Sequence, residues 1–253
     1  MVTLTAEQQK IVDIACPPSA LPRTRIIRVT AGAGAGKTTT LEHLARALYS
    51  AGHKCVYVTY NKAAAKDASG RLGLTAQCST IHSLAYRSCY GAGAEDRAKV
   101  VDDVAIEDMV LAHCPVNSMV DRGRLGRGKQ PSKSLRRTIA FWVRKTMETF
   151  CRSKHDRQMG FNPSTFGSTY YPAKLAHEKG EMPLVRSYDD FYVRSAELIY
   201  DKIQSEGLIT YDIMMKEAQL RNKRVDCTAL LVDESQDCNE CQVHTRIMRS
   251  YTS

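Results

Sequence analysis

The sequence lacks a hydrophobic run of the roughly 20 residues that a membrane-spanning helix needs. Its first residues, Met1–Glu7, contain neither the basic region nor the apolar core of a secretory signal peptide. A disulfide framework is also missing, because the nine cysteines are odd in number and scattered, several within apolar stretches such as Cys55–Val58. These absences favour an intracellular protein with reduced cysteines and no membrane contact, nuclear in a eukaryote and otherwise cytoplasmic.

No internal repeat is visible, and the one C-x-x-C pair, Cys238 and Cys241, has no second pair to complete a zinc site. With 253 residues and 43% hydrophobic content, the chain is long enough for one large or two smaller domains.

The most informative segment that is present runs from Thr30 to Thr40. The apolar residues Ile26–Val29 precede it, and a one-face helical pattern follows it. Strand, glycine-rich turn, Lys-Thr and helix is the context of a phosphate-binding loop, in which backbone N–H groups and a helix N-terminus bind phosphate. The segment departs from G-x-x-x-x-G-K-[ST] only at Ala31. A dinucleotide-binding turn is the rival interpretation, but G-x-G-x-G followed at once by Lys-Thr favours the phosphate-binding loop.

This loop predicts a site for a nucleoside triphosphate with Mg²⁺. Lys37 would reach the β- and γ-phosphates, and the Thr38 hydroxyl would bind the metal. The residues expected to line the nucleotide are Ala31, Gly32, Ala33, Gly34, Ala35, Gly36, Lys37, Thr38 and Thr39.

A second motif, Leu230–Asp237, places two adjacent acids after an apolar strand. The first, Asp233, is expected to hold Mg²⁺, and the second, Glu234, to take a proton from the attacking water. Alone this motif is weak, because turns are commonly acidic. Together with the phosphate-binding loop it becomes a strong indication of a triphosphate-hydrolysing site.

Positive charge is concentrated between Arg122 and Arg157. This segment holds twelve Lys and Arg against two acids, a balance of +10, whereas the whole chain carries +9 and the rest therefore −1. It begins with the flexible stretch Arg122–Lys129. The segment predicts contact with a nucleic-acid backbone, with Arg122, Arg124, Arg127 and Lys129 as candidates. A solvated loop or a nuclear-import signal is the alternative.

Strand and helix patterns alternate in two blocks, which predicts parallel β-α units. The expected strands are 26–30, 55–59, 75–79 and 229–232, and the expected helices are 38–50, 62–71, 81–90 and 211–220. Between them the strand signal disappears, with helices at 101–113, 134–150 and 190–204, a capping box at Ser187–Asp190 and a loop at 157–182. We expect an α/β core with a parallel sheet (1–95 and 205–253) and a mostly helical, basic inserted subdomain (96–204).

Together the motifs resemble the UvrD/Rep-like superfamily 1 DNA helicases, most closely the F-box DNA helicase branch. The matching segments, in family order, are Leu4–Gln9 (Q motif), Ala31–Thr38 (motif I), Tyr57–Lys62 (motif Ia), Ser79–Tyr86 (the T-x-H segment), Thr210–Asp212 and Asp233–Gln236 (motif II, D-E-x-Q).

The resemblance implies a RecA-like P-loop domain of an ATP-dependent 3′–5′ DNA helicase, with ATP and Mg²⁺ as cofactors and roles in DNA repair and recombination. It assigns adenine contact to Gln8 and catalysis to Lys37, Glu234 and Gln236. Single-stranded or tailed duplex DNA is the implied partner, contacted by Thr59, Tyr60, Asn61, Lys62, Thr80 and His82.

Some of these assignments have structural alternatives. Gln8 follows Thr5 by three residues and could instead complete a capping box, His82 could be a core histidine, and Tyr60 could serve packing. Only 17 residues follow Gln236, so the family's second RecA-like domain is expected elsewhere, in cis or in trans. A catalytically weak ATP- or DNA-binding module, or a truncated regulatory form, is the alternative function.

Overall fold

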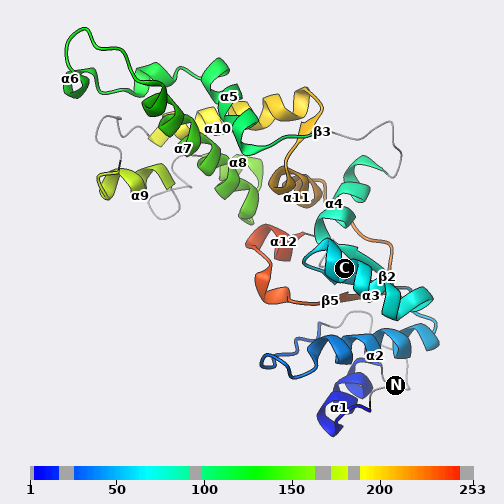
Figure 1. The fold of residues 1–253 in the computed structure, drawn as a ribbon. Coiled ribbons are helices and arrows are strands. Elements are labelled where there is room, and N and C mark those ends of the chain that lie inside the picture. Colours follow the sequence, from blue (N-terminus) through cyan, green and yellow to red (C-terminus); the bar gives the residue numbers. More distant parts are fainter. Residues whose placement is uncertain (1–2, 17–25, 92–98, 163–171, 182–188, 246–253) are drawn as a thin grey trace. The chain divides into compact units, whose positions relative to one another are not determined.

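The computed structural model describes residues 3–16, 26–91, 99–162, 172–181 and 189–245 (Figure 1). It divides into two units, Met1–Cys89 with Arg221–Ser253, and Tyr90–Leu220. The sequence suggests boundaries near 95 and 205, whereas the structure groups residues 205–220 with the inserted unit. Each unit is described by itself below.

The first unit is a parallel sheet with helices, as the sequence predicts, but the sheet has three described strands and not the four expected. The strand order is β2-β1-β5, so strands from the two ends of the unit meet at β1. Its elements are α1 (Ala6–Ala15), α2 (Lys37–Ser50), β1 (Cys55–Thr59), α3 (Lys62–Leu72), a 3₁₀ turn (Gly73–Thr75), β2 (Gln77–Thr80), α4 (Ile81–Tyr90), β5 (Ala229–Val232), a second 3₁₀ turn (Ser235–Asp237) and α12 (Glu240–His244).

Register places the ends of the three strands at one edge of the sheet. Val58 of β1 is opposite Ser79 of β2 and Val232 of β5, so the residues that follow all three strands lie close together. All five residues of β1 are buried, which is typical of a central parallel strand covered on both faces.

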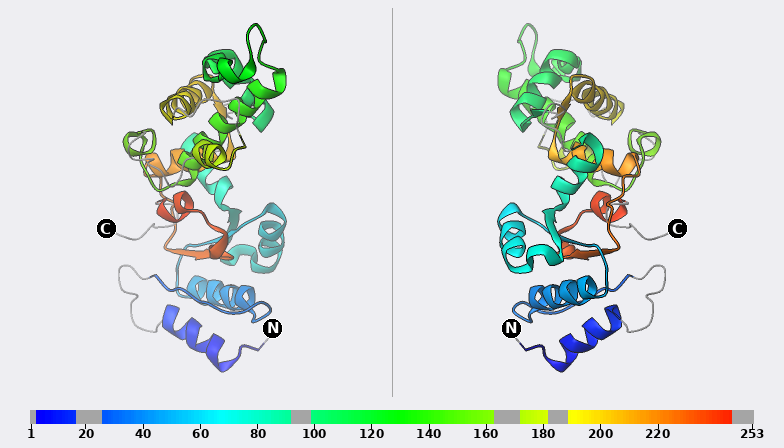
Figure 2. Two further views of the ribbon diagram at one scale, coloured as in Figure 1. Left: turned by 90° about the vertical axis from the view of Figure 1, so that its left-hand side faces the viewer. Right: turned by 90° about the vertical axis from the view of Figure 1, so that its right-hand side faces the viewer.

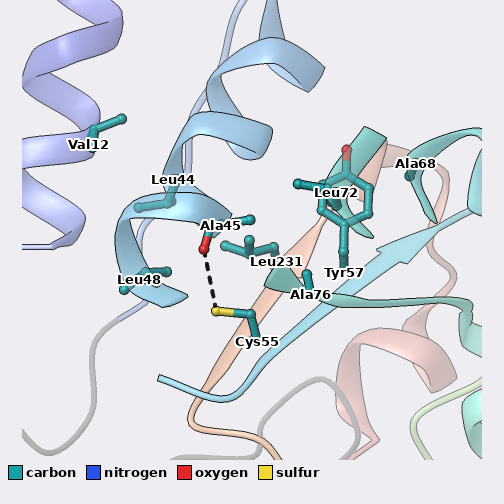
Figure 3. Close-up of a cluster of buried hydrophobic side chains, with 10 residues drawn as sticks. All are labelled: Val12, Leu44, Ala45, Leu48, Cys55, Tyr57, Ala68, Leu72, Ala76 and Leu231. Atoms are coloured by element: carbon teal, nitrogen blue, oxygen red, sulfur yellow. Dashed lines mark hydrogen bonds between the residues drawn. The ribbon is translucent and has the colours of Figure 1, made fainter. Parts of the chain in front are cut away.

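The core of this unit joins α2 and α3 to one face of the sheet (Figure 3). Leu44, Ala45 and Leu48 of α2 recur at helical spacing and are buried against Cys55 and Tyr57, which alternate on β1. The blue helices α1 and α2 pack side by side in Figures 1 and 2. Packing of α2 on the sheet therefore fixes where its first residues, Lys37 and Thr38, lie.

The expected strand at Ile26–Thr30 is wrong. No described strand pairs with this segment, and Ile26 is 79% exposed. An apolar run shows only a tendency to form a strand, because a strand also needs a neighbouring strand with which to exchange backbone hydrogen bonds. The strand expected at 75–79 begins later, at Gln77, because residues 73–75 form the 3₁₀ turn after α3.

The second unit is mostly helical (Figure 1). It is built around α7, which contacts α5, α9, α10 and α11. Its elements are β3 (Lys99–Val100), α5 (Asp103–His113), a 3₁₀ turn (Val116–Met119), α6 (Arg122–Leu125), α7 (Lys133–Arg152), α8 (Arg157–Gly160), α9 (Pro172–Glu178), α10 (Asp189–Ser205), β4 (Leu208–Ile209) and α11 (Tyr211–Leu220).

Three expectations for this unit need correction. The strands β3 and β4 pair in parallel, although β3 lies in the region expected to lack strands, about 91–207, and β4 directly follows it. Two residues each are too few to show a periodic pattern. The expected loop at 157–182 contains α8 and α9, and the expected flexible stretch at 122–129 begins with α6, which the Asp121 side chain caps. The capping box at Ser187–Asp190 lies largely outside the described residues. No described helix is long and apolar enough to span a bilayer.

Candidate functional site

The glycine-rich loop turns sharply into the start of α2. Gly34 and Gly36 have φ values of 73° and 77°, in the left-handed region that residues with a Cβ rarely adopt. Gly36 is the last residue before α2, and Lys37 and Thr38 begin the helix. These two glycines therefore set the angle at which the loop enters the helix.

Among the residues that the structure describes, no side chain caps the N-terminus of α2. In contrast, Thr5, Asn61, Asp102 and Ser132 each accept a backbone hydrogen bond at the start of α1, α3, α5 and α7. The first N–H groups of a helix have no partner within it, so an uncapped start presents donors and partial positive charge to an anion. The start of α2 thus has the form of a phosphate-binding site.

The Lys37 side chain lies over this loop. Its Nζ donates to the carbonyl oxygens of Ala31 and Gly32, at 3.2 and 3.1 Å. The ammonium group is therefore held beside the same loop whose N–H groups would bind phosphate. Ala31, the one departure from the motif, contributes its carbonyl oxygen, which any residue can supply.

Thr38 and Asp233 meet although 195 residues separate them. The Thr38 hydroxyl Oγ1 donates to Asp233 Oδ2 at 2.9 Å. Asp233 directly follows β5, and its N–H donates to the carbonyl oxygen of Val58 at 2.9 Å, so the sheet ladder itself fixes its backbone. A hydroxyl and a carboxylate side by side are the hard oxygen ligands that suit Mg²⁺.

Tyr57 is a site residue that the sequence reasoning missed. It is fully buried, and its hydroxyl donates to the same Asp233 oxygen, Oδ2, at 2.9 Å. Burial, and then the Asp233 charge and hydrogen bond, raise the pKa of Tyr57 well above its ordinary value. A tyrosine amid valines in a central strand was the available signal, since a buried hydroxyl needs a partner.

Glu234 has a left-handed backbone, with φ 53°. This conformation is unfavourable for a residue with a Cβ and is concentrated at functional sites. The Glu234 side chain is exposed, and Gln236 Nε2 donates to its Oε2. The strained turn after β5 thus directs two of the expected catalytic residues toward each other.

Gln8 contacts the phosphate-binding loop and also closes a capping box with Thr5. Its Nε2 is 3.4 Å from the carbonyl oxygens of Ala35 and Gly36. A Cβ at Gly36 would lie 2.6 Å from this nitrogen, so the side chain packs closely on the loop. Gln8 therefore does complete the capping box with Thr5, as the alternative interpretation expects, and its side chain contacts the phosphate-binding loop as well.

The residues expected to contact DNA in this unit follow β1 and β2, whose ends are in register at Thr59 and Thr80. Thr59 and Thr80 are buried, and each hydrogen-bonds locally, to the Asn61 carbonyl oxygen and to Ser83. Asn61 caps α3. These three residues shape the edge, whereas Tyr60, 57% exposed, and the exposed Lys62 are accessible to a ligand. His82 is half-buried.

The basic segment carries less available charge than its composition indicates. Half of its twelve cations form ion pairs with acids, many of which lie outside the segment on α5, α10 and α11; the paired cations are Arg124, Arg137, Arg144, Lys145, Arg152 and Arg157. Of the segment's exposed cations that form no ion pair with any described residue, all but Lys154 lie on α6, at the start of α7 or between these helices. We call this group the basic connection: Arg122, Arg127, Lys129 and Lys133.

Known proteins resemble this chain over most of its length. The sequence model of the AAA domain family matches residues 15–250. Over 158 residues, 62% of the chain and 17% of the relative, the sequence is 30% identical to F-box DNA helicase protein 1 of Schizosaccharomyces pombe. Over 243 residues, 94% of the chain and 21% of the relative, it is 28% identical to F-box DNA helicase 1 of Gallus gallus.

The chain spans about a fifth of the length of these curated relatives. The family model covers most of the chain, and both this match and the phosphate-binding loop indicate an α/β fold of the P-loop type. The chain belongs to the AAA domain family and is related to the superfamily 1 helicases of the UvrD/Rep type.

Proposed function

We propose that this chain is the ATP-binding part of a DNA helicase, which binds Mg-ATP at the start of α2 and single-stranded DNA at the ends of β1 and β2. The observation that carries the proposal is the contact between Thr38 and Asp233, at 2.9 Å, beside an uncapped helix N-terminus. Two sequence-distant motifs of a triphosphate site converge there on one pair of oxygen atoms.

Each nucleotide-site residue has a distinct task in this proposal. Backbone N–H groups of 31–39 surround the phosphates, and Lys37 moves its ammonium from the loop carbonyls to the β- and γ-phosphates. Thr38 and Asp233 hold Mg²⁺, which neutralises charge on the phosphates when it is bound. Gln8, whose side chain contacts the loop, is the proposed contact for adenine.

Glu234 is the proposed base that takes a proton from the attacking water. Its exposed carboxylate directly follows the metal-holding Asp233, and Gln236 orients it by a hydrogen bond.

For DNA we propose two separate contact surfaces, one on each unit. On the first, Tyr60 stacks on a base and Lys62 binds a phosphate, with His82 nearby in sequence after β2. On the second, the basic connection, with the partly paired Arg124, binds the sugar-phosphate backbone. Neither surface reads sequence, as suits a protein that moves along a strand.

The nucleotide half of the proposal is tested with Lys37→Ala and the matched control Lys10→Ala, an exposed lysine on α1. Hydrogen bonds to charged groups contribute about 1.5 to 3 kcal/mol each, so Lys37→Ala should weaken binding of a fluorescent ATP analogue by about tenfold or more. Lys10→Ala should bind as the parent does. Equal affinities for both variants would remove the phosphate-loop assignment.

The helicase half is tested by ATP hydrolysis with and without single-stranded DNA. Stimulation by DNA is the expected result, and its absence at saturating DNA would leave a nucleotide-binding module only. We further propose that unwinding, 3′ to 5′, needs a second RecA-like domain in cis or in trans. In the helicases that this chain resembles, the second domain supplies arginines to the nucleotide site, and arginines that contact the transferred phosphoryl group contribute about 10³–10⁵ in rate. Strand displacement on a tailed duplex by the 253-residue chain alone would contradict this.

A further inference from the structure

We propose that Tyr57 is a positioning residue of the magnesium site, which fixes the Asp233 carboxylate so that Asp233 and Thr38 are arranged before the metal arrives. The inference rests on the proposed function, because it assigns a role to a residue next to the proposed metal ligands. It adds a group on β1 that neither the phosphate-binding loop nor the Asp233–Gln236 motif contains.

The Tyr57 hydroxyl is rigidly placed. Its ring is fully buried in the cluster of Figure 3, with Leu72 and Ala68 of α3 and Leu231 of β5 as further members. Tyr57 and Leu231 are also opposite each other in the β1–β5 register. Since a packed aromatic ring on a central strand cannot swing away, the hydroxyl stays at 2.9 Å from Asp233 Oδ2.

Each oxygen of Asp233 has a donor from a different part of the fold. Oδ1 accepts from the Glu234 N–H at 3.0 Å, and Oδ2 accepts from both Thr38 and Tyr57 at 2.9 Å. With both oxygens held, the carboxylate cannot rotate about its last side-chain bond. Of the two donors to Oδ2, Thr38 is itself a proposed ligand, so Tyr57 is the one that can hold Asp233 while Thr38 serves the metal.

Groups behind the ligands of a metal orient those ligands, and their loss typically lowers metal affinity by about 10- to 100-fold. The opposing interpretation is that Asp233 merely satisfies a buried tyrosine hydroxyl. The two differ in what Tyr57→Phe changes. A purely structural hydroxyl would alter stability alone, whereas a positioning hydroxyl alters how much Mg²⁺ is needed for nucleotide binding.

The experiment measures affinity for a fluorescent ATP analogue over a range of Mg²⁺ concentrations and in EDTA, for the parent chain, Tyr57→Phe and Tyr192→Phe. Tyr192 is a buried tyrosine of the other unit and serves as the matched control. We expect Tyr57→Phe to raise the Mg²⁺ concentration for half-maximal binding by about tenfold or more, with unchanged affinity in EDTA. Tyr192→Phe should leave the Mg²⁺ dependence unaltered.

A second measurement tests whether Tyr57 acts through Asp233. In the background of Asp233→Asn, the additional change Tyr57→Phe should have no further effect on Mg²⁺ dependence, because the group that Tyr57 positions is already altered. Parent-like Mg²⁺ dependence in Tyr57→Phe, or full additivity with Asp233→Asn, overturns the inference while the proposed function stands. If the parent chain binds nucleotide with no Mg²⁺ dependence, the proposed magnesium site and the inference are both wrong.

Discussion

Replacement of the buried Lys216 should destabilise the inserted unit strongly. Lys216 lies on α11, is fully buried, and donates from Nζ to the carbonyl oxygens of Ser153 and His155, at 2.7 and 2.9 Å, and to Gln219 Oε1 at 2.7 Å. The same ammonium is 4.5 Å from the centre of the Phe150 ring. It therefore places a cationic donor at the C-terminal end of α7, where carbonyl groups lack helical partners.

The variant Lys216→Met keeps the aliphatic stem and removes the three hydrogen bonds. Each is of the charge-assisted kind, about 1.5 to 3 kcal/mol, but Met also avoids the cost of burying an ammonium, and water can reach the half-buried Ser153 and His155. We expect a loss of about 3 kcal/mol in the free energy of unfolding. For a chain of this size that lowers the melting temperature by about 6 to 12 °C.

Urea denaturation and thermal melting followed by circular dichroism measure this loss. The control is Lys154→Met, an exposed lysine just after α7, which should change stability by less than about 0.5 kcal/mol. The Lys216 effect should also persist at high salt, because buried groups are poorly screened. A loss below about 1 kcal/mol for Lys216→Met would refute the reasoning that these hydrogen bonds hold α11 to the end of α7.

Three further predictions concern the site and its surroundings. Glu234→Gln should bind Mg-ATP as the parent does and abolish turnover; hydrolysis at the parental rate would contradict its role as base. Replacing the four residues of the basic connection by Gln should reduce the salt dependence of single-stranded DNA binding. The slope of log K against log salt concentration should fall by about 0.7 for each phosphate that is no longer neutralised. The same charge change at four exposed cations elsewhere should leave the slope unaltered: Lys10, Lys154, Lys179 and Arg224. Burial raises the pKa of Cys55 from 9.0 to about 11, so the thiol of the unfolded chain ionises at a lower pH than the folded one. The free energy of unfolding should therefore fall by about 2 to 3 kcal/mol between pH 9 and 11. Urea titrations at both pH values measure this fall, and Cys55→Ala should remove it.

Local pattern was sufficient for the elements that position the site. The bounds of β1, α4, α11 and β5 match the sequence expectation, and those of α2 and α3 differ by one residue. These segments combine a periodic apolar face with clear boundary signals, such as Asn61 before α3. Where a boundary signal or a partner strand was decisive, as at 26–30 and 75–79, pattern alone gave the wrong element or the wrong start.

The charge of the basic segment shows a different kind of error. Counting Lys and Arg along the chain treats each as free, but Arg144 and Arg137 pair with acids on α5, and Arg157 pairs with Asp201 on α10. Such partners are remote in sequence and become neighbours only when the helices pack. The unpaired surface charge of the segment is therefore concentrated in the basic connection, a subset that composition could not select.

By itself the sequence determined where the proposed nucleotide site lies. It contains a glycine-rich loop with Lys37 and Thr38, and two acids after an apolar strand, and both are local patterns defined by their residue spacing. Tertiary structure alone decided which further groups meet them. Tyr57 reaches Asp233 across 176 residues only because β1 and β5 are neighbours in one register. A one-residue slip of that register would turn the Tyr57 side chain relative to β5 and break the contact, and no local pattern records which strands pair.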